Sequence, residues 1–295
     1  MTLTPKDTKQ TQQNKQKPKK LSKKKRRIIT LSIICALMLS FIISLIISNF
    51  SIKINILKID SDSIKNPLRI AVISDMHQRE HGKDNKKLFS KIDEQNPDLI
   101  LVAGDMVSSS KSKEESLSYL EHLTVSLQNI APVYFVIGNH DRNIPELRST
   151  IQSNGGTLLD KEYTDIHING NTIRLGGISY YRSWDKESNR FIAGFSDVSE
   201  DVFTLLLCHY PELYLWGIED YPIDLTVCGH THGGMVKIPL IGPLFAPEQG
   251  WFPDYAAGLY SMKNGYLAVT TGLSSSPEYL PRVFNRPEIM IIDLE

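Results

Sequence analysis

Five short segments of the chain end in side chains that commonly bind metal ions. They carry Asp75 with His77, Asp105, Asn139 with His140 and Asp141, His209, and His230 with His232. Five of the eight histidines in the sequence lie in these segments. Carboxylates, an amide oxygen and imidazoles form a mixed oxygen and nitrogen ligand set, which suits divalent ions such as Mn, Fe, Co or Zn. The pattern therefore indicates a metal site.

The number of candidate ligands bears on how many ions the site holds. Seven side chains qualify, namely Asp75, His77, Asp105, Asn139, His209, His230 and His232. Such a set exceeds what one ion needs and fits two ions roughly 3.5–4 Å apart with a bridging carboxylate, an arrangement that activates water for displacement at phosphorus. Taken singly, each residue also has a structural explanation, because an Asp can cap a helix and a His can be hydrogen-bonded inside the protein.

Buried strands must bring these segments together. Short apolar runs that end in polar residues predict strands within 68–77, 98–105, 132–141, 203–210 and 225–234. Helical patterns separate the first three strands and follow the third, over about 83–95, 113–130 and 144–156. Alternating strands and helices predict a largely parallel sheet covered by helices. In such sheets ligands bind at the carboxyl ends of the strands, which is where these side chains lie.

Later segments follow a different pattern. Residues 164–181 and 266–294 predict further strands joined by turns at Asn169-Gly170 and Asn264-Gly265. The predicted fold class is therefore α/β with mixed sheets.

The five segments, taken in order, resemble a known family. Asp75-Met76-His77, Gly104-Asp105, Gly138-Asn139-His140-Asp141, His209 and Gly229-His230-Thr231-His232 look like the motifs of the calcineurin-like metallophosphoesterase superfamily. The likeness covers residues 68–295. The stretches 230–239, 270–277 and 286–294 further resemble the membrane-anchored bacterial phosphodiesterases of the YaeI and YkuE type. Met235 stands where that branch is expected to have Gln, a difference at the rim of the site.

The resemblance implies a fold and a division of roles. It implies a four-layer αββα sandwich of two mixed β-sheets flanked by helices. The implied ligands are Asp75, His77 and His232 for one metal ion, Asn139, His209 and His230 for a second, and Asp105 as the bridge. His140 would be a general acid or charge stabiliser, oriented by a hydrogen bond that its ring donates to Asp141. The implied reaction is hydrolysis of a phosphodiester by attack of a metal-bridging hydroxide.

The net charge of zero hides a division of the chain. Residues 1–27 hold eleven of the 33 basic residues and one of the 33 acidic residues, which leaves the remainder strongly acidic. Residues 28–50 contain no ionisable side chain except Cys35. As a helix they would be about 34 Å long, enough to cross a hydrocarbon core of roughly 30 Å. An uncleaved signal-anchor is favoured over a cleaved signal peptide, because the apolar stretch is long and no small-residue cleavage site follows it.

Basic residues next to a membrane span stay on the cytoplasmic side. The expected organisation is a cytoplasmic tail at 1–27, a single-pass transmembrane helix at 28–50, a short strand or linker at 51–67, and an extracytoplasmic catalytic domain at 68–295. The acidic domain argues against a nucleic-acid substrate. Only Cys208 and Cys228 lie outside the span, and their strand-end positions predict buried side chains, not ligands.

Several alternatives remain open at the level of sequence. The substrate would be a phosphodiester or, alternatively, the pyrophosphate of a nucleotide-linked glycolipid of the UDP-2,3-diacylglucosamine type. A non-catalytic metal-binding module is a third reading. The apolar segment 236–260 could form a wall for a lipid chain or a packed rim loop. Arg142 and Arg282 are candidate cations at the mouth of the site.

Overall fold

The computed structural model describes residues 22–141, 144–179, 185–275 and 280–295. The chain divides into two compact units, residues 1–42 and residues 43–295. Helix α1 (Lys23–Phe50) begins in the first unit and ends in the second. Among the described residues it is the one helix long and apolar enough to cross a membrane, with a mean hydropathy of 2.7.

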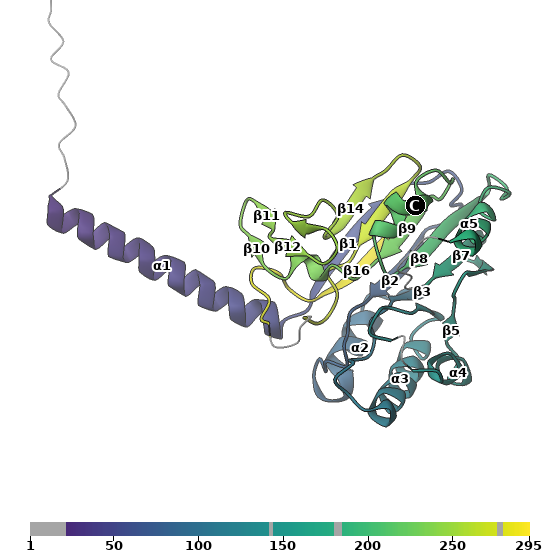
Figure 1. The fold of residues 1–295 in the computed structure, drawn as a ribbon, viewed down its shortest axis with the longest axis horizontal. Coiled ribbons are helices and arrows are strands. Elements are labelled where there is room, and N and C mark those ends of the chain that lie inside the picture. Colours follow the sequence, from purple (N-terminus) through teal and green to yellow (C-terminus); the bar gives the residue numbers. More distant parts are fainter. Residues whose placement is uncertain (1–21, 142–143, 180–184, 276–279) are drawn as a thin grey trace, which may run out of the picture. The chain divides into compact units, whose positions relative to one another are not determined.

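Two six-stranded sheets form the framework of residues 43–295 (Figure 1). The first has the strand order β1-β16-β2-β3-β4-β5. Its strands are β1 (Lys53–Ile59), β2 (Leu68–Ile73), β3 (Leu99–Ala103), β4 (Val133–Val136), β5 (Thr157–Leu158) and β16 (Glu288–Leu294). β16 pairs antiparallel with β2 and parallel with β1, while β2 to β5 pair in parallel. The sheet is therefore mixed.

The second sheet has the order β14-β15-β9-β8-β7-β6. Its strands are β6 (Glu162–Ile168), β7 (Asn171–Ile178), β8 (Val202–Cys208), β9 (Leu225–Cys228), β14 (Gly258–Ser261) and β15 (Tyr266–Val269). The outer pairs β6–β7 and β14–β15 are antiparallel, and the inner pairs are parallel. The predicted turn at Asn169-Gly170 joins β6 to β7, and both of its residues have positive φ.

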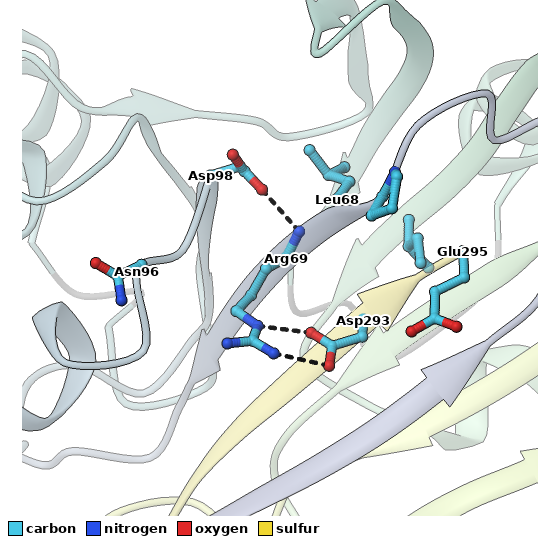
Figure 2. Close-up of a pocket in the computed structure, with 8 residues that line it drawn as sticks. Leu68, Arg69, Asn96, Asp98, Asp293 and Glu295 are labelled. Carbon is cyan, nitrogen blue, oxygen red and sulfur yellow. Dashed lines mark hydrogen bonds and ion pairs between the residues drawn. The ribbon is translucent and has the colours of Figure 1, made fainter.

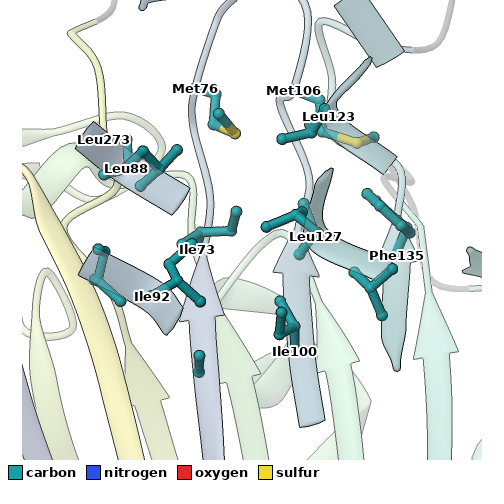
Figure 3. Packing of buried hydrophobic residues seen from close by; sticks show 14 of the residues in the cluster. Ile73, Met76, Leu88, Ile92, Ile100, Met106, Leu123, Leu127, Phe135 and Leu273 are labelled. Carbon is teal, nitrogen blue, oxygen red and sulfur yellow. The ribbon is translucent and has the colours of Figure 1, made fainter. Parts of the chain in front are cut away.

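Alternation of side chains along the strands builds the layers. On β2, Ile70 and Val72 pack between the two sheets, whereas Ala71 and Ile73 face the helices. The helices on that face are α2 (Lys86–Asp93), α3 (Lys113–Gln128) and α4 (Leu147–Ser153), which lie together on one side of the sandwich (Figure 1). Figure 3 shows Leu88 and Ile92 of α2 and Leu123 and Leu127 of α3 against this face.

The outer face of the second sheet has its own cover. Leu206 and Cys208 of β8 pack with Phe191 and Ile192 of α5 (Lys186–Ala193). The alternate residues of β8, namely Phe203, Leu205 and Leu207, face the first sheet. The order helix, sheet, sheet, helix confirms the predicted four-layer αββα sandwich. Helix α5 was not among the predicted elements.

One predicted domain boundary shifts. The stretch 51–67, expected as a short strand or linker ahead of the catalytic domain, contains the strand β1, whose seven residues pair with β16 from Lys53–Glu288 to Ile59–Leu294. The alternating sequence of β1 buries one side of an edge strand, and this partner lies more than 200 residues away in the chain. Residues 53–59 therefore belong to the first sheet.

Candidate active site

The predicted ligands meet at one edge of the sandwich, beyond the carboxyl ends of five strands. Asp75 and His77 follow β2, Asp105 follows β3, Asn139 follows β4, His209 follows β8, and His230 and His232 follow β9. Because these strands run in parallel within their sheets, their ends converge at the same edge. The strand ends thus bring the predicted ligands to one site.

Short distances connect these side chains. Asp105 Oδ2 lies 3.3 Å from His209 Nε2 and 3.7 Å from His77 Nε2. Asp75 Oδ1 lies 3.6 Å from His232 Nε2. Ligand atoms of Asp75, Asp105 and His209 lie within 4.8 Å of one another, as do those of Asp75, His77 and His232. Asp105 therefore occupies the middle of the cluster.

The remaining predicted ligands join through single contacts. Asn139 Oδ1 lies 3.2 Å from His209 Nε2. The backbone N–H of His230 donates to Asp75 Oδ2 at 3.1 Å, while its ring Nε2 donates to Glu248 Oε2 at 2.7 Å. The structure thus brings all seven predicted ligands together, with the ring of His230 directed at Glu248. Their division between two ions stays a prediction.

Unsatisfied buried atoms test whether a metal fits. Asp75 and His77 are almost fully buried, yet Asp75 Oδ1 and His77 Nε2 have no hydrogen-bond partner among the described residues. Leaving a buried polar atom without a partner is costly, and such atoms in native proteins need an explanation. The two atoms face the cluster of carboxylates and imidazoles described above, a donor set suited to divalent cations. The residues fit a metal.

In two of the histidines, the ring nitrogen that faces away from the cluster has a hydrogen-bond partner of its own. His209 Nδ1 donates to the carbonyl of Ala103 at 2.7 Å, and His232 Nδ1 donates to the carbonyl of Ser274 at 3.1 Å. In both rings this leaves Nε2 for the cluster. Metal-binding histidines usually donate their other nitrogen in this way, which fixes the orientation of the ring.

Charge is distributed unevenly among the metal-free side chains. Burial lowers the pKa of His77 to about 4 and the pKa of His232 to about 3, so both rings are neutral at pH 7. Burial also opposes a charge on His209, but the adjacent Asp105 carboxylate outweighs it and raises the pKa of His209 to about 10. Burial works against ionisation of Asp105 as well, yet His209 and His77 hold the pKa of this carboxyl well below its usual range. Asp105 and His209 therefore form a buried ion pair.

Backbone conformation at the ligands is unusual. Asp75, His77, Asp105, His230 and His232 all have φ between 46° and 69°. Non-glycine residues rarely adopt this region, and such strain gathers at functional sites. Close packing accompanies it, because a Cβ at Gly138 would lie 2.1 Å from Asp105 Oδ1. The strands hold the ligands at the cost of local strain.

The predicted partnership of Asp141 and His140 is wrong in its stated form. Both carboxylate oxygens of Asp141 accept backbone N–H groups, from Val107 at 3.0 Å and Gly138 at 2.9 Å. The backbone N–H of His140 donates to Asp105 Oδ1, and its ring Nδ1 lies 3.4 Å from Ser109 Oγ. Asp141 therefore joins the loops after β3 and β4, which positions the His140 backbone and not its ring.

Two residues near the ligands were missed by the sequence analysis. Glu248 binds the ring of His230, and the hydroxyl of Tyr210 donates to Asn139 Oδ1 at 3.1 Å. The ring of Tyr210 also stacks on His230, with centroids 3.8 Å apart. Tyr210 directly follows ligand His209, a position that could have singled it out. Glu248 lies in the turn between β12 (Phe245–Ala246) and β13 (Gly250–Trp251), where no such signal marks it.

Other expectations have mixed outcomes. Arg282 is fully buried and donates to the carbonyls of Thr271 and Ser274, so it is not a cation at an open mouth. Arg142 lies outside the described residues. Cys208 and Cys228 are buried with their sulfurs 3.0 Å apart, as expected for packed side chains. Met235 contributes its carbonyl to the site, which accepts from Asn285 Nδ2 at 3.3 Å.

A cavity opens beside the ligands. It has a volume of about 440 Å³, and its lining includes His77, Arg79, Lys111 and Ser274. A second cavity, of about 280 Å³, lies at the other end of β2 around Arg69 and Asp293 (Figure 2). Only the first contains a predicted ligand.

Comparison with known proteins agrees with this geometry. Residues 68–234 match the family model described as calcineurin-like phosphoesterase. The chain is 31% identical to the Bacillus subtilis protein YpbG over 221 residues, covering 72% of this chain and 80% of YpbG. It is 32% identical to the phosphodiesterase YaeI of Escherichia coli over 206 residues, covering 68% of this chain and 72% of YaeI. It is 23% identical to the UDP-2,3-diacylglucosamine pyrophosphatase LpxG of Chlamydia trachomatis over 283 residues, covering 76% of this chain and 83% of LpxG.

Proposed function

The chain belongs to the calcineurin-like phosphoesterase family, a family of metal-dependent phosphoric ester hydrolases, and we propose that it is a membrane-anchored phosphodiesterase with two divalent metal ions. The observation that carries the proposal is the buried cluster around Asp105, in which Asp75 Oδ1 and His77 Nε2 have no hydrogen-bond partner among the described residues. Similarity to the phosphodiesterase YaeI supports the reaction type. A non-catalytic role is not needed, since each predicted ligand is present.

The proposed ligands are Asp75, His77 and His232 for one ion, Asn139, His209 and His230 for the other, and Asp105 for both. The ions would supply a water of lowered pKa and positive charge for the phosphoryl oxygens. Asp105 suits the shared position because its carboxylate contacts histidines of both groups. The carbonyls of Ala103 and Ser274 keep the Nε2 atoms of His209 and His232 directed at the centre.

His140 is the proposed general acid. Its ring lies beside His77, with centroids 4.6 Å apart, and is partly exposed. A nitrogen of the ring could thus approach the leaving oxygen, while His77 would be one of the residues that hold the metal. Protonation of that oxygen would release an alcohol and leave a phosphomonoester. Positioned acids of this kind typically accelerate a reaction by about 10²–10⁴-fold.

We place the catalytic domain outside the cytoplasmic membrane, with α1 as a single-pass anchor. The basic tail before the apolar stretch supports this orientation. Protease treatment of intact, outer-layer-stripped cells tests it. Digestion of residues 51–295 is expected, and protection of the domain would contradict the orientation.

Hydrolysis of bis(p-nitrophenyl) phosphate tests the activity. The full chain in detergent micelles, supplied in turn with Mn, Zn, Fe, Co, Ni or Mg, is expected to release p-nitrophenol, and a chelator should abolish the release. No turnover with any of these ions would refute the proposal. Because p-nitrophenyl phosphate is the other product, its persistence would distinguish a diesterase from a monoesterase.

A pyrophosphate substrate is the second candidate. It is supported by similarity to the LpxG pyrophosphatases of two Chlamydia species. Incubation with UDP-2,3-diacylglucosamine, followed by mass spectrometry, tests this candidate. Formation of UMP would favour it, whereas turnover of simple diesters alone would favour the first candidate.

A further inference from the structure

Large apolar side chains project from the loops that follow the last metal ligands. We call this set the apolar rim, and it comprises Leu240, Ile241, Phe245, Trp251, Phe252, Leu280 and Phe284. Leu240 is fully exposed, and Ile241, Trp251 and Phe252 each expose at least 60% of their surface. Two small hairpins, β10–β11 (Lys237–Ile238 with Gly242–Pro243) and β12–β13 (Phe245–Ala246 with Gly250–Trp251), carry most of the rim. Exposed apolar patches of this kind mark interaction sites.

The end of helix α1 is attached to the same loops. The backbone N–H of Phe284 donates to Ser44 Oγ at 2.6 Å, and the N–H of Asn285 donates to Ser48 Oγ at 3.2 Å. Asn49 Oδ1 accepts the N–H of Arg282 at 3.1 Å, and its amide donates to the carbonyl of the same residue at 3.0 Å. Ser44 and Ser48 are the buried residues of the described helix. The rim is thus fixed to the last two turns of α1.

This attachment sets the level of the rim relative to a membrane. Ser44 lies six residues before the end of the apolar stretch, or about 9 Å along the helix axis. A stretch that crosses the bilayer therefore places the backbone of Phe284 just inside the outer boundary of the hydrocarbon core, below the headgroups. Backbone groups at that depth must have hydrogen-bond partners, and the two serine hydroxyls provide them. Trp251 suits the same level, since tryptophan is enriched at membrane interfaces.

The rim is also connected to the metal ligands. Lys237 N–H donates to the carbonyl of Val283 at 2.9 Å, which joins the first hairpin to the segment attached to α1. Asn285 Nδ2 donates to the carbonyl of ligand His232 at 2.7 Å. One continuous piece of structure therefore connects α1, the rim and the metal cluster.

The cavity of about 440 Å³ lies at this junction. Asn49 from α1, His77 from the cluster, and Leu280 and Pro281 from the rim side all line it. Its volume is in the range of ordinary small-molecule sites. Arg79 and Lys111 add two basic side chains to the lining, and Arg79 donates to the carbonyl of Asn49 at 2.6 Å instead of to a carboxylate. A phosphate group is the ligand that such a cavity would take.

We propose that the apolar rim inserts into the headgroup region of the bilayer that α1 crosses, so that a phosphodiester lipid reaches the metal site directly from the bilayer. The phosphate would pass between Asn49 and Leu280 to His77, while the acyl chains stay beside the rim. This inference rests on the proposed anchor and deepens the proposed function. Insertion of the rim and the diesterase activity are tested by separate experiments.

Quenching of tryptophan fluorescence tests insertion without any need for activity. The full chain carrying Trp184→Phe and Trp216→Phe retains Trp251 alone and is reconstituted in phosphatidylcholine vesicles with or without brominated acyl chains. Brominated lipid is expected to lower its emission by about half or more, as for a residue in the membrane interface. Unchanged emission would overturn the proposal, even if the chain proves to be an active diesterase.

Trp216 provides the matched control. It is about half exposed but lies on η2 (Tyr214–Ile218), and Glu219 just after η2 contacts the β14–β15 turn, which lies at the opposite end of β15 and β9 from the predicted ligands. The variant with Trp184→Phe and Trp251→Phe retains Trp216 and should not be quenched. Equal quenching of both tryptophans would show general adsorption and would also overturn the proposal.

Kinetics test the route of the lipid. Two methylumbelliferyl phosphodiesters are compared in the same vesicles, one linked to a dialkylglycerol and one to a methyl group; water adds across the phosphorus–oxygen bond and methylumbelliferone leaves. Leu240→Asn with Ile241→Asn is expected to lower kcat/KM for the lipid-linked diester about tenfold and to leave the methyl diester within about twofold. Val125→Asn, which changes an exposed apolar residue on α3, should alter neither. Equal losses on both diesters, or no loss on either, would contradict the route.

Discussion

At the amino end of β2, Arg69 donates to both carboxylate oxygens of Asp293 at 2.7 and 2.9 Å, and its backbone N–H donates to Asp98 (Figure 2). At the carboxyl end of the same strand, Asp75 and His77 are more deeply buried and yet retain atoms without partners among the described residues. Both ends gather charged residues around a cavity. Polar groups with hydrogen-bond partners therefore hold the fold together, whereas buried polar groups without them indicate a site that binds a ligand.

The largest effect is expected from Asp105→Ala. This change removes the carboxylate that contacts both His77 and His209, so metal should be lost and hydrolysis of bis(p-nitrophenyl) phosphate should fall at least about 10³-fold. Metal analysis and the hydrolysis rate are measured on the same sample. Undiminished activity would refute the assigned bridge.

His140→Ala should separate catalysis from metal binding. The ring of His140 is proposed to act on the leaving oxygen, so kcat should fall by about 10²-fold or more while the metal content stays unchanged. With a diester whose leaving group is a poorer one than p-nitrophenolate, the fall in kcat should be larger. A variant that loses metal in proportion to activity would instead assign His140 to the ligand set.

A smaller effect is expected from pH. His209, whose pKa is about 10 in the metal-free site, is protonated at pH 7 and must release a proton when its Nε2 binds a metal. Because of this one proton, the affinity for the metal should rise about tenfold per pH unit between pH 6 and pH 9. Calorimetry in buffers of different ionisation enthalpy counts the protons. The His209→Ala variant should release one proton fewer on binding metal. An identical proton count in the two proteins would contradict the positive charge assigned to His209.

The smallest effect on activity is expected at the opposite end of β2. Arg69→Met removes a partly exposed ion pair and leaves Asp293 without its partner, so the free energy of unfolding should fall by about 1 kcal/mol. kcat should stay within about twofold of the original value, because this end holds no ligand. Denaturant unfolding and the same hydrolysis assay give the two values. A large loss of kcat would contradict the assignment of a structural role to the amino end of β2 and a catalytic role to its carboxyl end.

The sequence predicted the candidate ligands because local patterns mark them. Asp75, Asp105 and His209 each follow an apolar strand, so their convergence required only the rule for parallel sheets. The partners of Asp141 and the place of Glu248 depend on how separate loops meet, which no local pattern encodes.

The fold was also hard to predict where strands pair with partners that are distant in the sequence. The alternation in residues 53–59 predicted a strand or linker, but its partner β16 lies at the far end of the chain. The attachment of Ser44 to Phe284 joins segments equally distant in sequence. Within an apolar stretch, a serine gives no indication of which backbone group it will bind.

Metal content tests the central claim most directly. The purified full chain is incubated with Mn, dialysed and measured by plasma mass spectrometry, in parallel with Asp105→Ala and Arg69→Met. About two Mn ions per chain are expected for the original protein and for Arg69→Met, and a loss of metal is expected for Asp105→Ala. Absence of bound metal from a chain that still hydrolyses bis(p-nitrophenyl) phosphate in the presence of a chelator would contradict the central claim.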